Sequence, residues 1–215
     1  MSDLRWLKAA GWEEALREMR RRGRWIVGIC GGYQMLGDEV ADPLGVEGDT
    51  AVERGLGFLP VRTAMSPLKT TRRVEARWEV GACAGTFWGY ELHMGRTIVG
   101  AAARPRFRVR AVEGVRWRRD GACDRAGRTW GTYVHGLFES GPFLQAWLSL
   151  VGGERDVAIR VGWRNWRGER DSRLDRLADV LERHLDMAAI RAATGLEESE
   201  RRVSRRRIGK SGQTY

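Results

Sequence analysis

The chain has 215 residues, 42% of them hydrophobic and 31% charged, with a formal net charge of +10 at pH 7. This length suffices for one domain with a sizeable core and a helical appendage. No apolar run approaches the roughly 20 residues of a membrane helix, and no signal-peptide pattern precedes the first charges. Cys30, Cys83 and Cys123 lie far apart without CxxC spacing. The sequence therefore excludes a disulfide framework, a metal site and a membrane partner, and predicts a cytoplasmic protein.

The positive charge has two interpretations. Arginine is dense at Arg20–Arg24 and at Arg201–Lys210, but no helix-turn-helix, zinc finger or RNP motif accompanies these clusters. A basic surface attracts nucleic acid, and it equally attracts an anionic polycarboxylate substrate. We expect no nucleic-acid partner; a nucleic-acid binder would show steeply salt-dependent binding to duplex DNA.

Two short helices are predicted ahead of the first strand. Leu4, Leu7 and Ala10 have helical spacing after the capping candidates Ser2–Asp3. A second helix is expected from Glu13 to Arg22, because glycines bound it on both sides.

The segment Trp25–Gly37, WIVGICGGYQMLG, contains the strongest chemical signal. Its apolar run predicts a short buried strand, and the glycines around Cys30 permit a sharp turn into a helix. This is the geometry of a nucleophile elbow with cysteine in place of serine. At a helix N-terminus the macrodipole and free N–H groups are expected to favour the thiolate. The alternative is that Cys30 is a small buried residue behind a tight turn.

The spacing Gly28-x-Cys30-x-Gly32-x-Gln34 resembles the signature of class I glutamine amidotransferases. This resemblance implies that Cys30 is a nucleophile and that Gln34 helps to hold the substrate glutamine. The N–H of Gly31, directly after the nucleophile, is the expected oxyanion donor.

After a predicted loop at 38–50, the chain is β-like from Gly55 to Arg110. Candidate strands lie at 57–61 and 70–78, and a strand pair broken by Pro105 is expected at 98–109. Within this region, Glu91 and His93 are two residues apart and therefore project from one face of an extended segment. They are either catalytic or a structural hydrogen-bonded clasp.

His135 ends the β-like run Trp130–Glu139 and is followed by glycine. A histidine at the carboxyl end of a strand can face an elbow residue at the same edge of the sheet, so His135 is the preferred general base. His93 is the rival candidate, and His184 is expected to be solvated on a later helix.

The remaining segments carry no predicted chemistry. Helices are expected at 143–151 and at 173–193, the second with an apolar stripe. We predict an amidotransferase domain at 1–150, a helical extension at 151–196, and a disordered basic tail at 197–215. The Trp- and Arg-rich stretch at 156–168 has no clear assignment.

Over roughly residues 3–190, the chain resembles the C-terminal glutamine amidotransferase region of the cobyric acid synthase family. The matching segments are Gly28–Gly37, Asp42–Pro43 with Gly45–Gly48, Gly55–Pro60, Gly89–Gly95, Gly131–Phe138 and Leu174–Asp186. The GYELHMG segment separates this family from generic class I amidotransferases. The implied fold is α/β, a flavodoxin-like layered sheet, here partly truncated and with a C-terminal helical extension.

The resemblance implies glutamine hydrolysis by Cys30 and His135 through a γ-glutamyl thioester. Ammonia would then pass to an ATP- and Mg-dependent synthetase domain, which amidates carboxylates of a corrin, adenosylcobyrinic acid a,c-diamide, in cobalamin biosynthesis. No cofactor is expected in the region present here. The synthetase domain and its corrin substrate are the implied partners, together with glutamine.

Departures from the family pattern add two expectations. Nothing resembles the synthetase P-loop, and the chain opens near the helix that follows the second oxyanion turn, so we expect an N-terminally truncated region. In many class I enzymes a triad carboxylate lies two residues after the histidine, where this chain has Leu137. Glu139, four residues beyond His135, and Glu91 are the candidates for that role.

Two alternative functions stay open at this point. The elbow also fits an amidotransferase subunit of another ligase, such as one that amidates lipid II, although GYELHMG argues against it. The second alternative is that the chain is a non-catalytic fragment that binds a partner.

Overall fold

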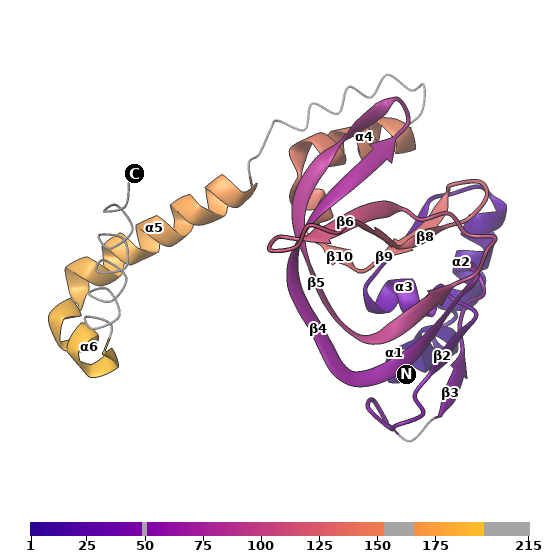
Figure 1. Ribbon diagram of the computed structural model, residues 1–215, viewed down its shortest axis with the longest axis horizontal. Helices are drawn as coiled ribbons and strands as arrows, with labels where there is room; N and C mark the ends of the chain where they lie inside the picture. The colour runs from indigo at the N-terminus through magenta and orange to yellow at the C-terminus, as the bar shows by residue number, and fades with distance from the viewer. Residues whose placement is uncertain (49–50, 153–165, 196–215) are drawn as a thin grey trace, which may run out of the picture. The chain divides into compact units, whose positions relative to one another are not determined.

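The computed structural model describes residues 1–48, 51–152 and 166–195 (Figure 1). The chain divides into two compact units between Asn165 and Trp166. The predicted tail at 197–215 and most of the unassigned stretch at 156–168 lie outside the described residues. The first unit combines helices with two sheets, so the predicted α/β class is confirmed.

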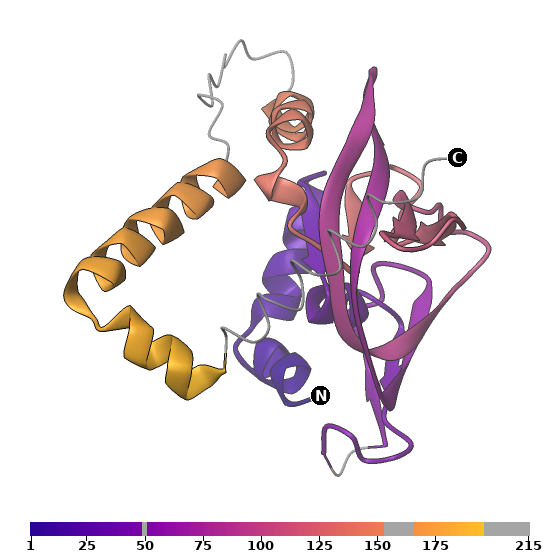
Figure 2. The same cartoon turned by 60° about the vertical axis from the view of Figure 1, so that its left-hand side comes forward.

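A small sheet carries the glycine-rich turn. Its strand order is β1-β9-β8, with β1 parallel to β9 and β8 antiparallel to it. Helix α3 begins one residue after Cys30, so the predicted strand, turn and helix are confirmed. Helices α1 and α2 lie on the same side of the hairpin of β4 (Val61–Val80) and β5 (Cys83–Val99) as α3 (Figure 2). The bounds are α1 Ser2–Ala9, α2 Trp12–Arg21, β1 Ile26–Ile29, α3 Gly31–Met35, β8 Ala122–Cys123 and β9 Thr129–Thr132.

The larger sheet is built on one long hairpin of β4 and β5 (Figure 2). These strands pair from the turn at Val80 and Cys83, with one shift of register between Ala64 and Lys69. The strand order is β10-β5-β4-β2-β3, and β6 pairs with both β4 and β7. The bounds are β2 Glu39–Ala41, β3 Val52–Arg54, β4 Val61–Val80, β5 Cys83–Val99, β6 Phe107–Ala111, β7 Arg118–Asp120 and β10 Val134–His135.

Several predicted bounds are wrong. The alternating stretch at 70–78 is only the centre of β4, and the expected strand pair at 98–109 is the end of β5 followed by the start of β6. The predicted loop at 38–50 contains β2, and Ser2–Asp3 lie inside α1 rather than capping it. Strand propensity is a weak guide here, because pairing along the whole hairpin holds even the charged centre of β4 in an extended conformation.

Strand β9 is anchored in two buried clusters. Trp130 belongs to the cluster formed by the hairpin, β6 and α4 (Gly141–Gly152), and it is fully buried. Its ring lies edge-on to Trp147, with 5.2 Å between ring centroids, an arrangement that aromatic quadrupoles favour. Tyr133, just after β9, belongs to the second cluster, which includes residues of α1 and α3. The course of the chain towards His135 is therefore fixed by packing before and after Thr132.

Two facing glycines let α3 pack closely on the small sheet. Gly28 of β1 is directly opposite Gly131 of β9. A Cβ at Gly131 would lie 2.2 Å from Cδ2 of the buried Tyr33, and one at Gly28 would lie 2.6 Å from the carbonyl oxygen of Gly32. Neither approach leaves room for a methyl group.

We predict that Gly131→Ala lowers the free energy of unfolding by about 1–3 kcal/mol, because the added Cβ would overlap atoms at the base of the buried Tyr33 ring as well as its edge. Gly32→Ala is the matched control, since a Cβ there meets no atom within 4 Å. Urea unfolding of both variants measures the difference. Equal stability of the two would contradict the packing argument.

The second unit contains α5 (Trp166–His184) and α6 (Met187–Thr194). The single helix predicted at 173–193 is therefore wrong. The first helix ends at His184, and Asp186 caps the second, because its carboxylate accepts a hydrogen bond of 3.0 Å from the Ala189 N–H. The predicted apolar stripe is exposed, with 55% exposure at Leu174 and 42% at Leu181. None of the helices in the described ranges is both long and apolar enough to cross a membrane.

Candidate active site

Cys30 adopts a strained backbone conformation at the turn between β1 and α3. With φ 55° and ψ −114°, it is the only non-glycine residue with positive φ among the residues that the structure describes. Such conformations cost about 1–3 kcal/mol and concentrate at functional sites. The Cys30 N–H donates to the Thr132 carbonyl oxygen at 2.9 Å, which continues the parallel pairing of β1 and β9 into the turn.

The Cys30 thiol is half-buried and faces the main chain of β5. Its Sγ lies 3.3 Å from the carbonyl oxygen of Leu92 and is placed to donate to it. Burial raises the pKa of the thiol, the Gly31 N–H acts in the opposite direction, and the charge of Glu47 raises the pKa further. Burial therefore opposes the lowering of the thiol pKa that was expected from the helix N-terminus. Helix α3 has only five residues, so its dipole does not outweigh desolvation.

His135 contacts the same stretch of β5 as the Cys30 thiol does. Strand β10 pairs His135 with Tyr90, and the two rings stack with centroids 5.0 Å apart and planes 6° apart. Its Nε2 is buried and has no hydrogen-bond partner in the described part of the chain. Residues 90–92 of β5 therefore contact both Cys30 and His135, which are 105 positions apart in sequence.

Gln34 connects α3 to the site. Its Nε2 donates to the Met94 carbonyl oxygen at 3.0 Å and lies 3.1 Å from the Tyr133 hydroxyl. Gly31 and Gln34 also line a small cavity of about 100 Å³ beside the turn. The carboxamide thus has a structural role in the unliganded protein, in addition to the substrate-binding role predicted for it.

Glu91 and His93 lie on the other face of β5. Because β10 pairs Val134 with Glu91 and His135 with Tyr90, the Glu91 side chain points away from the His135 ring. His93 stacks on Tyr133 with 3.8 Å between centroids, its Nδ1 lies 3.2 Å from the Gly95 carbonyl oxygen, and burial lowers its pKa. The structure therefore brings these two residues together, but not at the Cys30 thiol.

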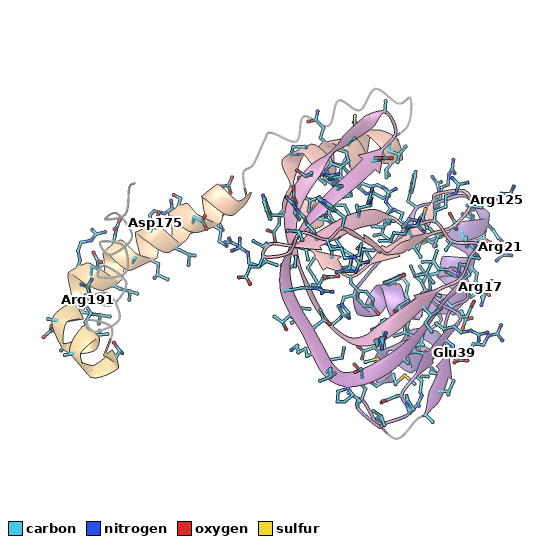
Figure 3. All side chains as sticks on the ribbon, viewed as in Figure 1. Arg17, Arg21, Glu39, Arg125, Asp175 and Arg191 are labelled. Atoms are coloured by element: carbon cyan, nitrogen blue, oxygen red, sulfur yellow. The ribbon has the colours of Figure 1, made fainter. Side chains whose placement is uncertain are left out.

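The remaining candidate residues from the sequence are exposed. Glu139 is exposed in a short 3₁₀ helix (Leu137–Glu139) and makes no hydrogen bond to His135 among the described residues, whereas Leu137 is buried. His184 is exposed, as predicted. No cluster of three metal-ligating side chains is present within 1–48, 51–152 and 166–195. Part of the basic cluster around Arg20–Arg24 is neutralised, because Arg21 pairs with Glu14 and Glu18 of α2. The position of Arg21 is labelled in Figure 3.

Sequence reasoning missed Asp120, which supports the strand leading to His135. Its buried carboxylate accepts hydrogen bonds from the Thr132 hydroxyl and the Tyr133 N–H. The Thr132 hydroxyl oxygen in turn accepts a hydrogen bond of 3.0 Å from the Val134 N–H. Burial raises the pKa of Asp120 to about 6. No local pattern marks Asp120, because its partners lie at least 12 residues away.

The raised pKa predicts a pH-dependent stability. Asp120 contributes stability that is complete below its unfolded pKa of 3.8 and is lost as the pH rises through about 6. Asp120→Asn cannot ionise, so from pH 4 to pH 7 its stability relative to the parent should increase by up to about 3 kcal/mol. Urea unfolding at several pH values measures this difference, with the exposed Asp38→Asn as control. A difference that does not change with pH would contradict the assignment.

Comparison with known proteins places the chain in a family. Residues 1–143, which include Cys30, Gly31, Gln34 and His135, match the CobB/CobQ-like glutamine amidotransferase domain. This match covers more than half of the chain, and the chain belongs to that family. The glutamine amidotransferase family that the sequence around Cys30 predicted is therefore confirmed.

The similar curated proteins are named cobyric acid synthase. The one from Rhizorhabdus wittichii is 43% identical over 190 residues, which are 88% of this chain and 36% of that protein. The one from Moorella thermoacetica is 38% identical over 207 residues, or 92% and 39% of the two chains. This chain thus spans little more than a third of the length of these relatives. A solved structure titled PurLQS from Thermotoga maritima is similar with a TM-score of 0.45 and 16% identity, over 63% of this chain and 66% of that one.

Proposed function

We propose that the chain hydrolyses glutamine to glutamate and ammonia, as the glutamine amidotransferase region of a cobyric acid synthase. The observation that carries this proposal is the arrangement of Cys30 and His135 against residues 90–92 of β5. A strained cysteine followed by the Gly31 N–H, together with a histidine that has a free buried nitrogen, provides a nucleophile, an oxyanion donor and a base.

The proposed chemistry starts with a proton transfer between the two groups. Because burial favours the neutral thiol, His135 takes its proton as the sulfur attacks the side-chain amide carbon of glutamine. The tetrahedral intermediate collapses when the same proton passes to the departing nitrogen, which leaves as ammonia. Water, deprotonated by His135, then attacks the γ-glutamyl thioester. Glutamate leaves, and the proton returns to the sulfur.

The ammonia is proposed to reach an ATP-dependent synthetase portion, which corresponds to the part of the relatives that this chain does not span. That portion would hold ATP and magnesium and activate carboxylates of a corrin, adenosylcobyrinic acid a,c-diamide. The region present here would need no cofactor. Its three cysteines are unpaired, which supports a reducing compartment, and we propose the cytoplasm.

A diazoketone analogue of glutamine tests the nucleophile. The reagent should alkylate Cys30 alone, excess glutamine should protect the thiol, and Cys30→Ala should remove the labelling. The exposed Cys83 and the buried Cys123 are internal controls, read by mass mapping of peptides. Equal labelling of the three cysteines, or labelling that glutamine does not slow, would contradict a glutamine site at Cys30.

A second prediction separates the base from the candidate triad acid. His135→Ala should reduce glutamine hydrolysis by about a hundredfold or more, because the Cys30 thiol then lacks the base that takes its proton. Glu139→Gln should change the rate by less than about threefold, because Glu139 is exposed and not bonded to His135. Initial rates of glutamate release provide the measurement. A similar loss in both variants would instead place Glu139 in a triad.

A further inference from the structure

A second cavity lies behind the strand that contacts the catalytic residues. It has a volume of about 610 Å³, within the range of small-molecule sites. Its walls are the inner face of the β4–β5 hairpin, the segment 99–105, and β7. Tyr33 and Tyr133 close it towards α3 and β9. Neither Cys30 nor His135 lines this cavity, so it is distinct from the proposed catalytic site.

The cavity has an excess of positive charge. Four arginines line it, against two carboxylates, Glu91 and Asp120. The Asp120 carboxylate is already used by the Thr132 hydroxyl and the Tyr133 N–H. The arginines are Arg72, Arg96, Arg118 and Arg119. An anion that enters the cavity therefore meets a net attractive field.

Glu91 holds two of these arginines in place. Arg72 Nε donates to Glu91 Oε2 at 2.6 Å, and Arg118 Nη2 donates to the same oxygen. Glu91 is 1% exposed, whereas the side chains of Arg72 and Arg118 are 43% and 37% exposed. One carboxylate oxygen thus orients two guanidinium groups whose remaining N–H donors stay accessible. A pair of guanidinium groups held in this way is preorganised to bind an oxyanion.

Neighbouring side chains complete a polar surface. Thr70 lies opposite His93 in the hairpin, and both line the cavity beside Arg72 and Glu91. The Nδ1 of His93 is engaged with the Gly95 carbonyl oxygen, and its ring is fixed by stacking on Tyr133. The arrangement is too polar for an apolar ligand and is built from side chains with fixed positions.

We propose that this cavity is a second ligand site, which binds the carboxylate or phosphate group of a small molecule between Arg72 and Arg118. Glu91 and His93, whose purpose the catalytic chemistry leaves unexplained, position and flank this site. Leu92, between them, faces the other way and accepts from the Cys30 thiol through its main chain. The three consecutive residues 91–93 therefore join the anion site to the nucleophile. The inference does not depend on glutamine hydrolysis.

Isothermal titration calorimetry on the full chain tests the site, with glutarate and inorganic phosphate as probes at low salt. At least one probe should bind saturably with a dissociation constant of about 1 mM or tighter. Binding of glutarate alone identifies a carboxylate ligand, binding of phosphate alone identifies a phosphate ester, and mutual competition shows that both occupy one oxyanion site. Absence of saturable binding of either probe up to about 10 mM would overturn the proposal.

Variants locate the binding. Arg118→Gln and Arg72→Gln should each weaken it at least tenfold, because each removes charged donors. Arg108→Gln is the matched control: it removes the same charge from an exposed position on the neighbouring strand β6, and it should change the affinity less than twofold. Equal weakening by Arg108→Gln would show binding to the general positive surface and would contradict the site.

Loss of folding is the other cause of weakened binding, and circular dichroism melting of each arginine variant separates the two. Arg72→Gln and Arg118→Gln should remain folded at the temperature of the titration and still bind the probes at least tenfold more weakly. A folded Arg118→Gln protein that binds the probes as tightly as the parent would contradict the proposal.

Discussion

The parallel pairing of β1 with β9 is the constraint on which the site depends. It places Ile29 opposite Thr132 and allows the Cys30 N–H to bond to the Thr132 carbonyl oxygen. The chain that leaves β1 must therefore turn at Cys30, while the chain that leaves β9 runs on to His135. Gly28 and Gly131 make this pairing compatible with α3, because side chains at these positions would occupy the space of the helix and of Tyr33. Close packing at Gly28 and Gly131 thus fixes the position of Cys30 relative to β9 and α3.

Strand β5 serves two sites through its alternation. Its outward residue Tyr90 stacks on His135, and the main chain of Leu92 contacts the thiol. Its inward residues Glu91 and His93 line the arginine-rich cavity instead. Because a strand presents successive side chains to opposite faces, one short segment can join a catalytic edge to a separate anion-binding surface. The alternation of faces along β5 gives a physical reason why successive residues of the GYELHMG segment have different roles.

The elbow could be predicted from the sequence because its signal is local: an apolar run, three glycines and a cysteine. The approach of Cys30 and His135 to one stretch of β5 was only partly predictable, because His135 lies on β10 of the larger sheet rather than at the end of a strand beside β1. The hairpin length was not predictable, because charged residues such as Arg72 and Arg73 obscure the strand pattern of β4. The direction of the Cys30 pKa was not predictable for a related reason: burial by the folded chain raises it, whereas the sequence shows only the local effect of a helix of five residues. Asp120 was missed because its hydrogen bonds are formed only in the tertiary structure.

In the proposed mechanism, the half-buried Cys30 thiol passes its proton to His135 and forms a covalent intermediate that exists only while glutamine is present. The most direct test is acid quenching of the protein during turnover of glutamine, followed by intact-mass and peptide analysis. The account predicts a mass increase of one glutamyl group on Cys30, absent from Cys30→Ala, which should also release no glutamate. Glutamate release that persists in Cys30→Ala, or a glutamyl group attached to another residue, would contradict it.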